Sequence, residues 1–365
     1  MKRYCSECET ITPRFNVWCS CSVPQPGFMS TIFEYGESLG DITITRLVRV
    51  LRTGALYEAV RKIENKEEKV LVKVAHNDSS EQIKREAVAL AKLRETRQHP
   101  MLPVLLPAYQ YAESKQRPYG KTVFQDETKY YLVYEHAEGE FLRDMLLKNP
   151  QPWYQHAAWL TIAIADVVAF VHVRAKMLIL NLSPESIMVR VDRDGIPRPF
   201  LIDLGMISAP DAVDSALVKR FVLPAYTAPE LLDGRAGSPF GAQTDVYGLG
   251  LLLYEMLAGH PAYPFKLRAP EDVRTAVRTT LPLPLNRTDL SADVTVTVMQ
   301  AIDKSPARRH QDIRTLAKEL RVRFGEVPAE KPKRRFPRRL VAAVVLIAFV
   351  LLIWTVLMAV TQTGA

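Results

Sequence analysis

The chain has 365 residues, of which 24% are charged and 48% apolar, enough for one large or two medium folded domains with short appendages. The net charge of +8 comes mostly from one stretch. Residues 331–339 hold six basic residues, no acid occurs after residue 330, and the first 330 residues hold 42 basic and 40 acidic ones. The body is therefore nearly neutral, which excludes a general electrostatic attraction to nucleic acid as its working principle.

All four cysteines lie in the first 21 residues, as Cys5-x2-Cys8 and Cys19-x-Cys21 separated by ten residues. Two close pairs of thiolates can supply the four tetrahedral ligands of Zn²⁺. So short a segment cannot bury a core, so bound metal would supply its folding free energy. We predict a zinc ribbon or knuckle over residues 1–22, in a reducing compartment. The alternative is a leader with four unpaired surface thiols.

We expect a linker over residues 23–42, which contain five turn-forming residues: Pro24, Pro26, Gly27, Gly36 and Gly40. Alternating apolar residues from Ile42 to Glu64 predict two strands around a turn at Arg52-Thr53-Gly54-Ala55. A further strand ends in Val70-Leu71-Val72-Lys73, and a helix is expected over residues 80–95.

Two apolar stretches follow. Tyr130 to Glu135 predicts another strand, which continues into His136-Ala137-Glu138-Gly139. Residues 154–176 predict a helix so apolar that we expect it in the core of the fold.

Two apolar runs, residues 187–191 and 199–205, flank Asp194-Gly195. This pattern predicts a β-hairpin with a two-residue type I′ turn. An irregular loop, Asn181 to Ser186, precedes the hairpin, and Asp203 stands at the end of its second apolar run. Since a buried carboxylate without a partner is costly, Asp203 is expected to hold a ligand or a cation.

The end of the chain predicts a membrane anchor. Residues 325–339 are rich in proline and basic residues, and residues 340–360 are 21 uncharged, apolar residues. As a helix, this length spans a bilayer core of roughly 30 Å. The basic run before it indicates that the N-terminal body lies in the cytoplasm. We therefore expect a single-pass membrane protein with a short tail, residues 361–365.

The order of these patterns resembles the eukaryotic-type Ser/Thr protein kinases, and the resemblance covers residues 43–324. Three segments resemble family motifs: V-L-V-K at residues 70–73 resembles V-A-I-K, I-L-N-L-S-P-E-S at 179–186 resembles H-R-D-L-K-P-x-N, and D-L-G at 203–205 resembles D-F-G. A-P-E at 228–230 matches the family, and the helix opening Thr244 to Gly250 resembles it too. The resemblance implies an α+β, bilobal fold. Its small β-rich lobe would span residues 43–136, and its large, mostly helical lobe residues 137–324.

The resemblance also implies a nucleotide site. Its residues would be Gly54 in the phosphate-covering hairpin, Lys73 and its partner Glu86, the hinge backbone at Glu135 and Ala137, and Asp203 as a Mg²⁺ ligand. Arg49 and Leu51 replace the first two glycines of that hairpin, and Leu71 replaces the alanine that touches adenine. We interpret Arg49 as a solvated strand charge, with a phosphate contact as the alternative, and expect Leu71 to fill the adenine slot.

The catalytic positions differ from the family. Asn181 stands where the family has its proton-accepting aspartate, and Ser183 stands where it has a lysine. Because an amide cannot accept a proton, general-base help of about 10²–10⁴-fold is lost. Ser186 replaces the second Mg²⁺ ligand, as a weaker oxygen donor. The structural positions are kept: Glu230 and Arg309 as an ion pair, and Asp245 as the anchor of the catalytic loop.

We therefore predict a membrane-anchored pseudokinase that acts as a signalling scaffold or allosteric binding module for protein partners, with phosphotransfer weak or absent. Two alternatives stay open: an active, atypical Ser/Thr protein kinase that transfers the γ-phosphate of ATP, and a binding protein that works through the zinc ribbon. Binding of ATP and Mg²⁺ also stays open. Lys73, Glu86 and Asp203 favour it, whereas the residues at positions 49, 51 and 71 oppose it.

Overall fold

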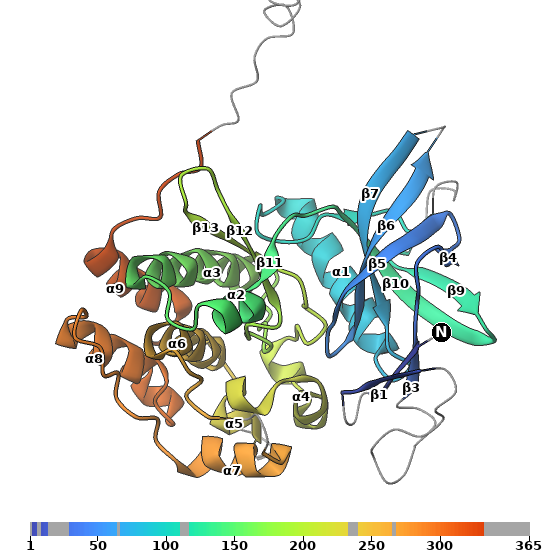
Figure 1. Ribbon diagram of the computed structural model, residues 1–365. Helices are drawn as coiled ribbons and strands as arrows, with labels where there is room; N and C mark the ends of the chain where they lie inside the picture. The colour runs from blue at the N-terminus through green and yellow to red at the C-terminus, as the bar shows by residue number, and fades with distance from the viewer. Residues whose placement is uncertain are drawn as a thin grey trace, which may run out of the picture. The chain divides into compact units, whose positions relative to one another are not determined.

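The structure, a computed structural model, describes residues 2–5, 9–13, 29–63, 66–109, 117–232, 240–264 and 268–331. The chain divides into a compact unit, residues 1–327, and a second unit, residues 328–365. The fold below is that of the compact unit (Figure 1). The predicted membrane helix, residues 340–360, lies outside the described residues.

The small lobe is built on an antiparallel sheet with strand order β4-β5-β6-β7-β10-β8, and β9 pairs with β10. The strands are β4 (Ser38–Leu39), β5 (Ile42–Val50), β6 (Gly54–Ile63), β7 (Lys66–Ala75), β8 (Leu105–Leu106), β9 (Gly120–Phe124) and β10 (Glu127–Glu135). Successive side chains of a strand point to opposite faces. Leu71 accordingly joins the core cluster that contains residues of helix α1 (Ser80–Thr96), whereas Val70 and Val72 join a second cluster on the other face.

Part of the predicted linker belongs to the small lobe instead. Strand β3 (Met29–Ile32) and strand β4 lie in it, and Ile32, Phe33 and Leu39 are buried in the second cluster. These apolar side chains cover a sheet face that would otherwise meet water, which outweighs the turn-forming glycines around them. Among the described residues, β3 also pairs with β1 (Lys2–Cys5), which pairs with β2 (Ile11–Pro13).

The large lobe is mostly helical. Its described helices are α2 (Leu142–Lys148), α3 (Tyr154–Arg174), α4 (Ser215–Phe221), α5 (Pro229–Leu232), α6 (Ala242–Ala258), α7 (Pro270–Thr279), α8 (Ala292–Ala301) and α9 (Ile313–Phe324). Figure 1 shows α3 and α6 at the centre of this lobe, and both are buried on nearly all sides. In the part of the chain that the structure describes, α3 is the one helix long and apolar enough to cross a membrane. However, 67% of its most apolar 18-residue stretch is buried in the fold. It is a core helix, as the sequence predicts.

The predicted hairpin is present, as β12 (Ile187–Val191) and β13 (Pro197–Leu201), with β11 (Glu140–Phe141) on its edge. The predicted two-residue turn is wrong. Five residues connect the strands, and the Asp192 carboxylate accepts hydrogen bonds from Asp194 N and Ile196 N at 2.9 Å each. Gly195 has φ 80°, whereas a type I′ turn needs positive φ at both central residues. The Asp192 side chain therefore stabilises a wider loop.

The predicted ion pair between Glu230 and Arg309 is present and buried. Arg309 Nη1 and Nη2 donate to the two Glu230 oxygens at 2.8 Å each, and Nε donates to Asp303 O at 2.7 Å. The same guanidinium also reaches the carbonyls of Gln243 and Lys304. One side chain thus ties α5, the start of α6 and the turn before α9 together.

Arg309→Lys should lower the free energy of unfolding by about 1–2 kcal/mol, because the ammonium keeps the charge but cannot serve five acceptors. Urea unfolding measures the change. Arg308→Lys is the matched control, since Arg308 is exposed and its ion-pair partner among the described residues is Asp303. Equal stability of the two variants would contradict the structural role of Arg309.

Candidate functional site

The loop Asn181 to Ser186 is held in place from α6. The Asp245 carboxylate accepts hydrogen bonds from Ile179 N and Leu180 N at 2.8 Å each, and His172 Nε2 lies 2.7 Å from it. Leu180 has φ 64°, a left-handed conformation that costs a non-glycine residue roughly 1–2 kcal/mol. Asp245 therefore does what the resemblance implies: it fixes a strained loop by its backbone.

Lys73, Glu86 and Asp203 form a buried triad. Lys73 Nζ, on β7, lies 2.5 Å from Glu86 Oε2 on α1 and 2.6 Å from Asp203 Oδ1, and all three side chains are at most 3% exposed. Burial alone would lower the pKa of Lys73, but the two carboxylates outweigh it and raise that pKa. Burial raises the pKa of Glu86. Burial would also raise the pKa of Asp203, but Lys73, Thr53 and Gly205 outweigh it and lower that pKa.

The Asp203 carboxylate has further partners inside the protein. Thr53 Oγ1 donates to Oδ1 at 2.6 Å, and Asn181 Nδ2 donates to Oδ2 at 3.2 Å. Counting Lys73, both oxygens already accept bonds from buried side chains. Both oxygens that would ligate Mg²⁺ in an active kinase therefore already have hydrogen-bond donors within the protein.

Thr53 reaches Asp203 because the turn between β5 and β6 folds inward. The turn closes with a bond from Leu51 N to Gly54 O at 2.8 Å, and Ser79 Oγ donates to Thr53 O at 2.5 Å. A Cβ on Gly54 would lie 2.4 Å from Val74 O, and one on Gly205 would lie 2.9 Å from the Thr53 side chain. Gly205 is required by the close approach of Thr53, and Gly54 by the close approach of the β7 backbone. Thr53 is completely buried.

The degenerate loop positions are buried as well. Ser186 Oγ donates within the loop, 2.7 Å from Asn181 O, and accepts from Ser183 N. It is therefore engaged in stabilising the loop rather than directed at a cation. Ser183 is 1% exposed, and its hydroxyl has no hydrogen-bond partner among the described residues. Neither hydroxyl replaces the positive charge of the lysine that the family has at the Ser183 position.

The side chains of the predicted adenine region are buried. Leu71, Leu51 and Tyr134 are each at most 3% exposed and belong to one apolar cluster. Leu71 and Tyr134 are cross-strand neighbours on β7 and β10, and the Tyr134 hydroxyl donates to Glu86 Oε1 at 2.9 Å. In the hinge, Glu135 N donates to Val104 O at 2.9 Å, and Ala137 is partly exposed.

Arg49 is not the solvated strand charge that the sequence suggests. From β5 its guanidinium donates to Glu185 Oε2 at 2.8 Å, pairs with Asp144 and lies 4.4 Å from the centre of the Phe141 ring. Those three partners belong to the large lobe, so Arg49 joins the lobes instead of waiting for phosphate. A second bridge links Arg220 on α4 to Asp78 of the small lobe at 2.5 Å.

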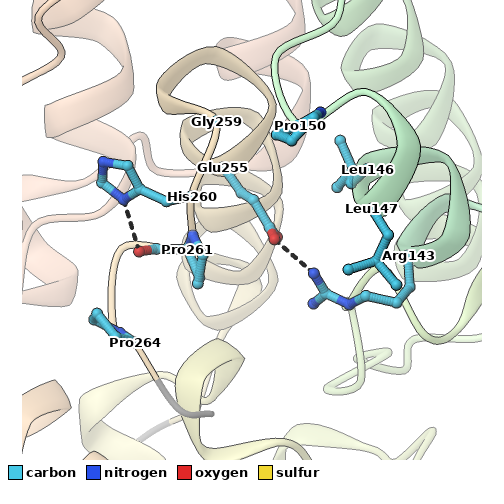
Figure 2. A pocket seen from close by; sticks show the side chains of 9 residues that line it. All are labelled: Arg143, Leu146, Leu147, Pro150, Glu255, Gly259, His260, Pro261 and Pro264. Carbon is cyan, nitrogen blue, oxygen red and sulfur yellow. Dashed lines mark hydrogen bonds and ion pairs between the residues drawn. The ribbon is translucent and has the colours of Figure 1, made fainter.

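Glu185, which is partly exposed, also belongs to a second network, next to a cavity of about 280 Å³ (Figure 2). Arg143 donates to Glu185 Oε1, to Glu255 Oε1 at 2.7 Å and to the Tyr226 hydroxyl at 2.7 Å. Figure 2 shows the Arg143–Glu255 pair at the edge of a hollow whose other walls are mostly apolar, from α2 and the residues after α6. The network connects the catalytic loop to α2, α6 and the segment before α5.

Of the four predicted zinc ligands, the structure describes Cys5. Cys8, Cys19 and Cys21 lie outside the described residues, and Cys5 is buried on β1. Within the described ranges no group of three or more His, Cys, Asp or Glu side chains is arranged to hold a metal ion.

The family model of the protein kinase domain matches residues 51–319 of this chain. The chain belongs to the protein kinase family. This kinase domain is similar to Ser/Thr kinases of bacteria. Serine/threonine-protein kinase PkaA of Streptomyces coelicolor is 34% identical over 133 residues, which are 36% of this chain and 24% of the relative.

Two further relatives align over longer stretches. Serine/threonine-protein kinase pkn2 of Myxococcus xanthus is 28% identical over 278 residues, 72% of this chain and 30% of the relative. Serine/threonine-protein kinase PknB of Mycobacterium leprae is 29% identical over 208 residues, 56% of this chain and 32% of the relative. The matches thus span between 24% and 32% of these relatives' own length.

Sequence reasoning missed Thr53, the Arg143 network and the bridge from Arg220 to Asp78. One of them had a usable signal. Glu255 is the one carboxylate in the apolar second half of helix α6, Leu249 to Ala258, and such a charge needs a buried partner. A threonine in a turn and an arginine on a surface helix carry no comparable signal, because both are common without any partner.

Proposed function

We propose that this kinase domain is a membrane-anchored pseudokinase that works as a signalling scaffold or allosteric binding module for protein partners. The observation that carries the proposal is the state of Asp203. Its two oxygens accept bonds from Lys73, Thr53 and Asn181, so the protein itself supplies the partners that Mg²⁺ and nucleotide supply in an active kinase.

The catalytic loop supports the same proposal. Asn181 cannot accept a proton and instead donates its amide hydrogen to Asp203. Ser183 brings no positive charge to steady a transferring phosphoryl group, and its hydroxyl is buried. Proton transfer and charge stabilisation would therefore both be missing, while the loop keeps a defined shape through Asp245.

Two appendages complete the proposal. The basic residues of 331–339 and the apolar stretch 340–360 would anchor the domain on the cytoplasmic face of a membrane. Cys5, Cys8, Cys19 and Cys21 would hold a structural Zn²⁺ ion through their thiolates. The anchor would limit the scaffold to partners at the same membrane.

A second candidate function is an active Ser/Thr protein kinase. The short contact between Lys73 and Glu86 favours it, because active kinases need this pair in place. The names of the bacterial relatives favour it too. Such an enzyme would have to release Thr53 from Asp203 before Mg²⁺ could bind.

Incubation of the full-length protein with radiolabelled ATP, Mg²⁺ and casein separates the two candidates. We expect no transfer to casein or to the protein itself above that of Asp203→Ala, because the base and the Mg²⁺ site are both lost. Titration with ATP and Mg²⁺ should likewise leave the melting temperature unchanged, whereas ligand at 100 times its Kd would stabilise the fold by about 2.7 kcal/mol. Turnover that depends on Asp203 would establish the active kinase.

A further inference from the structure

The N-terminal sheet (β1, β2 and β3) lies against the turn that closes the nucleotide site. Figure 1 shows β1 and β3, in dark blue, at one end of the small lobe. Two of its contacts reach the β5–β6 turn, residues 51–54. They come from Glu9, before β2, and from Tyr4 on β1.

The first contact is an ion pair. Glu9 Oε1 lies 2.5 Å from Arg52 Nη2, and Arg52 immediately precedes the Thr53 that bonds to Asp203. Glu9 is held for this contact by its backbone: its N–H donates to Cys5 O at 2.9 Å, and Cys5 N donates to Thr10 O at 3.0 Å. Its φ of 56° is unfavourable for a residue with a Cβ, so the surrounding bonds stabilise this conformation.

The second contact runs through a histidine. The Tyr4 ring is 6% exposed and stacks on His76, with the ring centres 4.7 Å apart. His76 Nε2 lies 2.8 Å from Leu51 O, at the start of the turn. Ser30 on β3 adds support nearby, because its hydroxyl accepts a bond from Asn77 N at 2.9 Å. The two contacts thus meet the turn at Leu51 and Arg52, the two residues just before Thr53.

We propose that the N-terminal sheet holds the β5–β6 turn down on Asp203, and so regulates whether the nucleotide site is closed. Loss of the Glu9–Arg52 and Tyr4–His76 contacts would let Thr53 withdraw. Asp203 would keep Lys73 and Asn181, and its Oδ1 would gain room for a divalent cation that arrives with a nucleoside triphosphate. The inference rests on the closed site of the proposed function and names the segment that keeps it closed.

Charge reversal in the full-length protein tests the proposal. Glu9→Arg and Arg52→Glu should each speed hydrogen exchange of the Leu51 amide about two- to fivefold, the range for a partly exposed ion pair. The double variant should restore the wild-type rate, because the pair re-forms with its signs exchanged. Tyr4→Leu should also speed exchange, since it removes the ring that packs on His76. Arg46→Glu is the matched control, because it breaks the Arg46–Glu58 pair of the same lobe away from the turn.

Unchanged exchange in both single variants, or a double variant as fast as the single ones, would overturn the proposal. ATP titration keeps this outcome separate from the proposed function. Saturable stabilisation of the wild-type protein by ATP and Mg²⁺ would show that the site is open, whatever the exchange rates. Stabilisation of the single variants alone would support both ideas together.

Discussion

Lys73→Met should destabilise this protein by about 3–5 kcal/mol, the range for removal of one partner from a buried ion pair. The substitution leaves Glu86 and Asp203 as two carboxylates that are 0% and 3% exposed, with their shared cation gone. In an active kinase the lysine at this position contacts the phosphates of the nucleotide. Here Lys73 neutralises two buried carboxylates, so its loss should lower the free energy of unfolding.

Unfolding in urea at pH 7 and pH 5 measures the effect. Loss of the cation raises the pKa of both carboxyls, so the folded variant binds protons more readily than its unfolded chain. Stability then rises as pH falls toward 5, and the deficit relative to wild type should shrink. In the wild type, by contrast, the lowered pKa of Asp203 contributes stability that is present above its unfolded pKa and is lost in stronger acid.

Lys84→Met is the matched control for this prediction. Lys84 lies on the exposed side of α1 and pairs with Glu81, which is 72% exposed, so its loss should cost at most about 1 kcal/mol at either pH. If Lys73→Met were as mild as this control, the buried triad would not be a stabilising element, and the argument for a structural use of Lys73 would be lost.

The sequence predicts the parts of the fold whose partners are dictated by the family architecture. Helix α1, helix α3, the hairpin strands, the Glu230–Arg309 pair and the Asp245 anchor all follow from local pattern and motif. The helices and the hairpin strands depend on apolar periodicity, whereas the Glu230–Arg309 pair and the Asp245 anchor follow from motifs that resemble the kinase family. Those features are visible in a few consecutive residues.

The contacts that close the site were not predictable in this way. Arg49 meets Glu185 and Thr53 meets Asp203 across 136 and 150 residues of sequence. Both contacts depend on how far the lobes approach each other, and no local pattern encodes that distance. Arg49 therefore looked like a solvated charge, although its pairing and its position over the Phe141 ring leave its side chain only 18% exposed.

Residues 29–42 pack on the small lobe where the sequence predicts a linker, for a related reason. Glycine and proline interrupt periodicity in residues 23–42, but Phe33 and Leu39 still find an apolar sheet face to cover. Turn-forming residues show where a chain bends and say little about whether it packs. The five-residue loop at Asp192 makes the same point, since a side-chain carboxylate replaced the backbone turn expected from Asp194-Gly195.

Asn181→Asp, which restores the family's proton acceptor, should destabilise the protein by about 2–4 kcal/mol at pH 7. Asn181 Nδ2 donates to Asp203 Oδ2 at 3.2 Å in a site that is 3% exposed at both residues. A carboxylate in its place removes that donor and sets two negative charges side by side. Restoring one catalytic residue therefore works against the closed arrangement of its neighbours.

Two measurements identify the cause of that loss. Below about pH 5 the introduced carboxyl takes up a proton and can donate again, so the deficit should shrink. Mg²⁺ placed between the two carboxylates should also stabilise the variant, while the wild type, whose Asp203 oxygens are already occupied by protein donors, should show no response. A variant as stable as wild type in metal-free buffer at pH 7 would contradict the coupling. Position 181 would then lack the family's general base without stabilising Asp203, and the Asp203 carboxylate could bind Mg²⁺.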